Sequence, residues 1–165
     1  MPGQISLLID SPLRDLLLRL RGVEADARKQ ALSAGRQTAG PIWQEELRGR
    51  AVSRLQVRVL SDTARVSVTA RNIQLKSATA GKLSSGTAVS ALAVATEFGM
   101  SPGSLYTTIS PRGKVYSRRA GTTFGGRTKA GKVVYPALDA AIPRITSLVI
   151  QTVTRSLLDA LNPKG

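Results

Sequence analysis

The chain has 165 residues, a formal net charge of +14, and neither cysteine nor histidine. Its length fits one domain, residues 1–165, which is large enough to bury a core. The missing Cys and His exclude disulfides, zinc fingers, thiol nucleophiles and imidazole acid–base catalysis. A pI near 11.4 is typical of nucleic-acid binders and of subunits in assemblies that handle nucleic acid. No apolar run approaches the roughly 18 residues of a membrane helix, so we expect a cytosolic origin and no membrane partner.

The first fifty residues predict a strand followed by two helices. Residues 5–9 are short and rich in branched apolar side chains, which favours a strand. Apolar residues then recur every three or four positions from Leu13, which predicts an amphipathic helix to about Gly35. A second, shorter helix is expected from Gly40-Pro41 to residues 49–51. Trp43 lies within it and is interpreted as a core anchor.

The middle of the chain alternates strictly between apolar and polar residues over two stretches, 55–59 and 65–71. This alternation predicts an antiparallel hairpin of two half-exposed strands. Residues 72–76 either continue the second strand or begin another. Residues 77–90 are Gly, Ser, Thr and Ala with almost nothing to bury, and we expect an extended loop there.

The second half combines a long basic segment with a long helix. Residues 91–98 are apolar enough for a strand or a short helix. Residues 101–132 hold six glycines, seven cations and no acid, which predicts an extended loop or a projecting hairpin. After a strand-like run at 133–135, an apolar stripe predicts a helix from near Ala140 with Pro143 in its first turn, a kink at Pro143 being the alternative. The expected fold is α+β, with a small antiparallel sheet packed against an N-terminal helix and a long C-terminal helix.

Two catalytic-looking motifs fail on their chemistry. Residues 99–103 match Gly-x-Ser-x-Gly, but Pro102 has no N–H for an oxyanion hole, and the chain has no histidine base. Residues 126–132 match a phosphate-binding loop up to its last position, where Val133 replaces the hydroxyl that ligates magnesium. The loop should also open a helix, but a strand-like run follows it at residues 133–135. We therefore expect no catalytic residues, no metal and no cofactor.

The charge pattern supplies the candidate site. Eleven Lys or Arg residues and a single acid, Glu97, lie between Thr63 and Leu138. Glu97 is interpreted either as a surface carboxylate that neutralises a neighbour or, with Phe98 and Gly99, as a subunit contact that pairs with a cation of the next copy. Partner-facing or DNA-facing roles are assigned to seven cations: Arg112, Lys114, Arg118, Arg119, Arg127, Lys129 and Lys132.

The order of these pieces resembles the tailed-phage family of neck and tail-completion proteins, which join the DNA-filled head to a long non-contractile tail. The most specific pieces are Ala-Thr-Glu-Phe-Gly at 95–99, Val-Val-Tyr-Pro-Ala-Leu at 133–138 and Ile-Pro-Arg-Ile at 142–145. The resemblance spans roughly Leu13 to Leu161. One departure lies in the second helix region, where the Thr-Gly of many members is missing.

The resemblance implies a structural virion protein rather than an enzyme. It implies a homo-oligomeric ring, sixfold, stacked around a DNA channel between stopper or portal-side proteins and the tail tube. The basic loop then faces either an acidic neighbouring ring or the head, or DNA phosphates in the channel; the first is favoured because a conduit should not hold its cargo tightly. A tail terminator that caps the tail tube is the alternative, and a free basic nucleic-acid-binding protein is the rival from another class.

Overall fold

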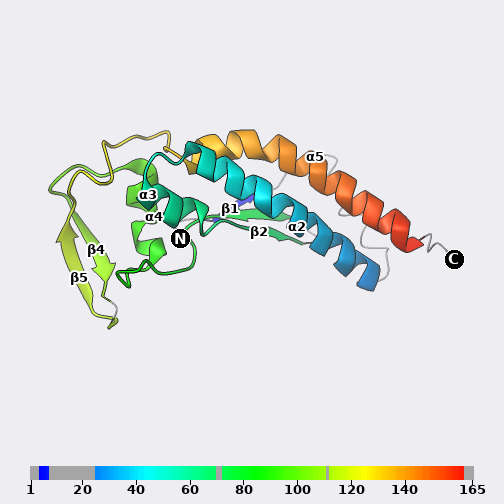
Figure 1. Cartoon of the computed structure of the whole chain (residues 1–165), viewed down its shortest axis with the longest axis horizontal. Coiled ribbons are helices and arrows are strands. Elements are labelled where there is room, and N and C mark those ends of the chain that lie inside the picture. The colour runs from blue at the N-terminus through cyan, green and yellow to red at the C-terminus, as the bar shows by residue number, and fades with distance from the viewer. Residues whose placement is uncertain (1–3, 8–24, 70–71, 111, 162–165) are drawn as a thin grey trace.

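Two long helices and a small sheet form the body of the protein. The structure, a computed structural model, describes residues 4–7, 25–69, 72–110 and 112–161. Helices α2 (Ala25–Arg50) and α5 (Val134–Leu161) run side by side in opposite directions along the molecule (Figure 1). Their buried residues follow rows spaced by four, Ala31, Gly35, Ala39, Trp43 and Leu47 on α2, and Ala137, Ala141, Ile145, Val149 and Val153 on α5. Such rows are the ridges by which helices pack.

A three-stranded antiparallel sheet lies beneath these helices (Figure 1). Its order is β1 (Gln4–Leu7), β3 (Ile73–Lys76), β2 (Arg65–Val68). The register places Val66 opposite Leu75 and Val68 opposite Ile73, all four of them buried. Since alternate residues of a strand share a face, one face of the sheet is apolar and packs inward.

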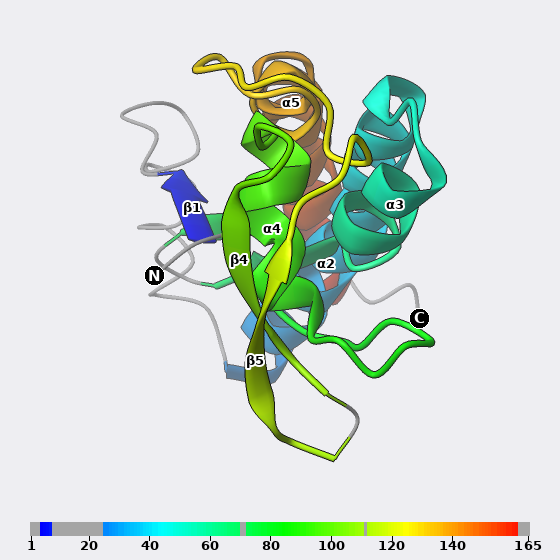
Figure 2. The ribbon, with the colours of Figure 1, turned by 90° about the vertical axis from the view of Figure 1, so that its left-hand side faces the viewer.

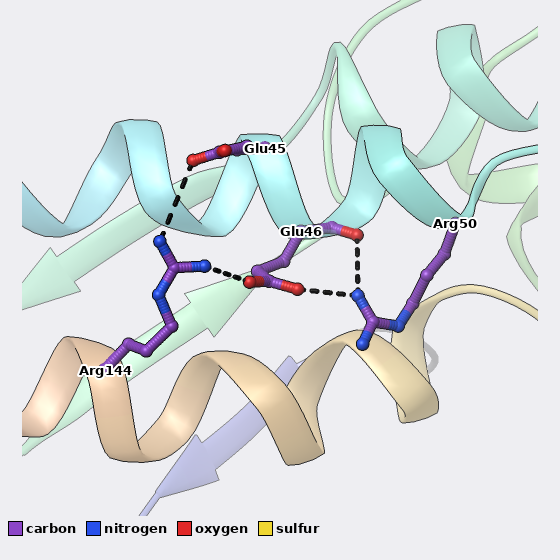
Figure 3. A network of polar contacts seen from close by, with 4 residues as sticks. All are labelled: Glu45, Glu46, Arg50 and Arg144. Atoms are coloured by element: carbon purple, nitrogen blue, oxygen red, sulfur yellow. Dashed lines mark hydrogen bonds and ion pairs between the residues drawn. The ribbon is translucent and has the colours of Figure 1, made fainter.

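One hydrogen bond and a group of ion pairs connect α2 to the sheet and to α5. The indole N–H of Trp43 donates to the Lys76 carbonyl at 3.0 Å, which joins α2 to the end of β3. On the outer seam Arg144 of α5 donates to the Glu46 carboxylate and lies 4.0 Å from that of Glu45, while Arg50 pairs with Glu46 at 2.6 Å (Figure 3). The anchoring role predicted for Trp43 is confirmed, because its side chain is 1% exposed. The adjacent residues Glu45 and Glu46 thus both contact Arg144.

A short helix and a hairpin extend from one end of this body. Helix α4 (Val89–Phe98) follows the loop of residues 77–88, and strands β4 (Leu105–Ile109) and β5 (Val115–Arg119) form an antiparallel pair beyond it (Figure 2). The predicted basic hairpin is therefore present, and the α+β class is confirmed. Residues 120–133 return from the hairpin to the start of α5.

Several element boundaries differ from the sequence prediction. Within the described residues the two predicted helices are one, because α2 continues through Gly40 and Pro41. The row of buried residues runs unbroken past that point, so packing against α5 overrides the local helix breaker. The strand expected at residues 5–9 is present as β1 over 4–7, and residues 8–9 lie outside the described residues. The first part of the expected helix, 13–24, lies outside the described residues.

The predicted strand at 55–59 is wrong. Residues 54–56 form a helical turn, α3 (Arg54–Gln56), which continues as the π-helix η2 (Val57–Ser61). A capping box starts it: the Ser53 hydroxyl accepts from the Gln56 N–H at 3.1 Å, and the Gln56 side chain accepts from the Ser53 N–H at 3.2 Å. Strand β2 therefore pairs with β3, and residues 73–76 form a strand of their own.

The second half contains more helix than predicted. Residues 91–98, predicted as a strand or a short helix, belong to helix α4, which confirms the second alternative. The run at 133–135 is not a strand, because α5 begins at Val134. Pro143 consequently lies in the interior of α5 instead of its first turn, and it is exposed there.

Candidate interaction site

Glu97 caps the N-terminus of α5. Its carboxylate accepts the backbone N–H groups of Lys132 (3.1 Å), Val133 (3.1 Å), Val134 (2.9 Å) and Tyr135 (3.2 Å). The next residue, Pro136, has no N–H, and the Ala137 N–H makes the first helical bond, to Val133. Every free donor of this helix end is thus satisfied by one carboxylate from α4, which also complements the positive end of the helix dipole.

This cap corrects the reading of Glu97 as a surface carboxylate, because the residue is only 5% exposed. Its contact with a cation of another copy stays a prediction, and such a cation would compete with four amides of the same chain. Glu97 is the last buried residue of α4 and lies two residues before the positive-φ Gly99, and its carboxylate meets the N-terminus of α5. The acid in the basic stretch therefore has a structural partner far away in the sequence.

Two glycines make room for the cap. A Cβ at Gly131 would lie 2.4 Å from the Glu97 Oε1 atom, and a Cβ at Gly99 would lie 2.1 Å from the Gly126 carbonyl oxygen. Both residues also have positive φ, 77° and 74°, which side chains other than hydrogen rarely tolerate. The Glu-Phe-Gly sequence and Gly131 thus belong to one tertiary junction.

Residues 126–132, which match a phosphate-binding loop in sequence, are part of the same junction. A helix does follow that segment, contrary to the prediction. However, the amides at its N-terminus, where phosphates bind in such loops, already hold the Glu97 carboxylate. Lys132 is also engaged, since its ammonium donates to the Phe124 carbonyl at 2.7 Å. The junction is built to hold an internal anion.

A groove of about 900 Å³ lies beside the junction. Its apolar wall comes from Val94 and Phe98 of α4 and from Met100, and its basic rim comes from Arg127 and Lys129. Backbone hydrogen bonds fix the walls, because the Thr128 N–H donates to the Phe98 carbonyl at 2.8 Å and the Met100 N–H to the Gly125 carbonyl at 3.2 Å. The structure therefore brings two of the seven predicted cations next to the predicted subunit contact at Phe98 and Gly99.

The remaining cations are distributed along the hairpin. Arg112 and Lys114 lie at its tip, and Arg118 and Arg119 lie on β5; all four are exposed. Lys132, in contrast, is half-buried in the junction. Hence six of the seven predicted cations are available to a partner, in two groups.

The hairpin also has an apolar outer face that the sequence prediction missed. Leu105, Ile109 and Val115 are 66%, 36% and 61% exposed. The register places Ile109 opposite Val115 and Leu105 opposite Arg119, so the three aliphatic side chains share one face of the pair. The four-residue spacing of Leu105 and Ile109 on a strand could have indicated this face.

The described residues show no sign of a metal site or a membrane span. No group of three or more acidic side chains comes together in them in a way that could hold a metal ion. None of the helices seen in the described parts of the chain is long and apolar enough to cross a bilayer. Comparisons of the chain with protein-family models, with curated proteins and with solved structures find no match.

Proposed function

We propose that the protein is a structural subunit of the phage head-to-tail connector, a tail-completion adaptor that forms a ring around the DNA channel of the virion neck. The observation that carries the proposal is the β4–β5 hairpin with its apolar outer face. An isolated two-stranded hairpin is marginally stable in water. An arm that extends from the body with Leu105 and Val115 more than half exposed is therefore suited to docking on another subunit.

The same hairpin separates this function from that of a free nucleic-acid binder. A surface that only binds phosphates needs cations and polar groups, and it gains little from exposed Leu, Ile and Val. Protein interfaces, in contrast, bury such side chains in their centre with polar groups at the rim. The hairpin has both parts, since its cations border the aliphatic face. Cyclic head-to-tail contacts through such an arm close a ring.

Arm variants of the full-length protein test the proposal. We expect Val115→Asp to abolish incorporation of the protein into virus particles, because a charge on the outer face prevents its burial. The measurement is complementation of a phage that lacks its own copy of the protein, with joined particles counted by electron microscopy. Heads and tails should then accumulate separately.

Val52→Asp is the matched control. Val52 is 92% exposed and lies between α2 and α3, away from the hairpin. It therefore receives the same substitution without a predicted contact, and joined particles should form. Equal assembly of both variants, with circular dichroism showing both folded, would reject the arm as the docking element and with it the proposed role.

A further inference from the structure

A second cavity, of about 310 Å³, lies against the hairpin and is separate from the groove beside Glu97. We call it the hairpin pocket. It is lined by β4 and β5, by the loop before α4, by residues 121–124, and by Leu55 and Leu92. Its volume is at the lower end of the range for small-ligand sites. The residues with polar side-chain groups that line it are Ser85, Thr87, Tyr106, Thr108, Arg118, Arg119 and Thr123.

The lining is rich in hydrogen-bond donors and contains no carboxylate. Arg118 and Arg119 have no acidic partner among the described residues. The Ser85 hydroxyl donates to the Thr87 oxygen at 3.1 Å, which leaves the Thr87 proton for another acceptor. The register places Arg118 opposite Tyr106, on the face of the hairpin that Thr108 shares, whereas Arg119 lies opposite Leu105 on the outer face. A cavity with the Arg118 guanidinium and no negative charge favours an anion.

Thr108 supplies an independent observation. The residue is 1% exposed, and its hydroxyl oxygen is buried without a hydrogen-bond partner. Buried hydroxyls are nearly always paired, so this one calls for an explanation. Thr108 lines the pocket, and rotation about its Cα–Cβ bond exchanges hydroxyl and methyl positions. A ligand in the pocket would give the hydroxyl its missing acceptor.

We infer that the hairpin pocket binds a phosphate group. The planar guanidinium of Arg118 on β5, with hydroxyls on β4 and in two loops, matches an anion with several oxygens directed in space, whereas a carboxylate offers two oxygens in one plane. The phosphate comes either from free inorganic phosphate or from the DNA backbone. This inference is independent of the proposed ring function.

Titration of the full-length protein with inorganic phosphate, followed by the NMR shifts of its backbone amides, tests the inference. We expect saturable shifts at residues that line the pocket. Arg118→Ala should weaken binding about ten-fold, because it removes a charge-assisted hydrogen bond. Arg112→Ala is the control, since it removes the same charge from the hairpin tip, and it should change the affinity less than about two-fold.

Thr108→Val separates binding from structure. Valine keeps the shape and removes the unpaired hydroxyl, so folding stability should be unchanged or higher, while phosphate binding falls about five-fold. If the hydroxyl has no ligand, this variant leaves phosphate affinity unchanged, which overturns the inference. Equal losses in Arg118→Ala and Arg112→Ala, or tighter binding of acetate than of phosphate, overturn it as well.

A short DNA duplex in the same assay identifies the source of the phosphate. If Arg118→Ala and Thr108→Val weaken DNA binding more than Arg112→Ala does, the pocket takes a phosphate of the DNA backbone. If all three have the same DNA affinity while phosphate affinity differs among them, the pocket takes free phosphate. Both results support the inference. If neither inorganic phosphate nor the DNA duplex shows saturable binding, the inference is rejected.

Discussion

At the scale of single residues, Glu97 has the clearest physical role in the structure. Sequence reasoning noticed it because it is the one acid in a long basic stretch, and assigned it to the surface. The backbone N–H groups that hold it carry no side-chain signature, so a sequence cannot show them. They come from residues 132–135, brought under α4 only when the chain folds. In the same way, the sequence shows that residue 131 is a glycine, but only the structure shows that this glycine makes room for the Glu97 carboxylate.

Replacing the carboxylate by an amide should therefore destabilise the protein. Glu97→Gln removes the negative charge at the start of α5 and directs an NH₂ group toward backbone donors. We expect a loss of about 1–3 kcal/mol in the free energy of unfolding, measured by urea denaturation. Glu45→Gln is the control, because the Glu45 side chain is 74% exposed and lies 4.0 Å from Arg144. Its effect should stay below about 0.5 kcal/mol, as for most surface pairs; a similar effect of both changes would contradict the capping role.

At the scale of elements, the sequence predicted the long helix α5 better than it predicted short segments. The apolar stripe after Leu138 predicted α5 because a helix that packs along its whole length repeats its pattern many times. The alternation at 55–59 covers only five residues, and the capping box of Ser53 and Gln56 outweighs it. That Ser-x-x-Gln signal was present in the sequence. The start of α5, in contrast, depends on Glu97 and could not be read locally.

The contact between α2 and α5 depends on a small residue in the buried row of α2. A Cβ at Gly35 would lie 3.2 Å from the Val153 Cγ2 atom and 3.3 Å from the Val149 Cγ1 atom. Gly35→Leu should therefore separate the helices and lower the free energy of unfolding by about 1–3 kcal/mol, measured by thermal or urea unfolding. Gly40→Leu has nothing within 4 Å of the added Cβ. This control should be neutral or slightly stabilising, because leucine favours a helix more than glycine does. Equal losses of stability in both variants would show that the close contact with Val149 and Val153 is not the reason for the loss at residue 35.

At the scale of the whole molecule, the basic segments are concentrated at one end. The hairpin and the return segment, residues 120–133, lie at the end of the two long helices away from the described end of α5 (Figure 1). Residues 98–138 contain no acid, so the hairpin and the return segment carry no counter-charge of their own. In the body, in contrast, Arg144 of α5 pairs with Glu45 and Glu46 of α2 across the helix seam. The hairpin and the return segment therefore form a cationic, partly apolar surface on the described part of the chain.

Charge reversal distinguishes a protein neighbour from DNA at that surface. Each phosphate contact changes the salt dependence of log affinity by about −0.9 per unit of log salt, and a ring multiplies the contacts of one subunit by the number of copies. A ring with its arms on DNA would therefore hold the genome in place, which favours an acidic protein partner. The arm variant replaces Arg112, Lys114 and Arg119 with glutamate. It leaves the junction at Glu97 and the Arg118 side chain unchanged.

We expect this arm variant to produce normal heads and tails that fail to join, counted by electron microscopy. Reversal of Arg28, Lys29 and Arg36 on α2 changes the net charge by the same amount and should leave joining intact. We expect the two variants to differ because salt screens exposed charges beyond roughly 10 Å. Only cations close to the interface therefore contribute to joining. Joined particles that fail only to deliver DNA would instead assign the arm to the channel. Equal loss of joining in both variants would mean that total charge, not the arm, controls assembly.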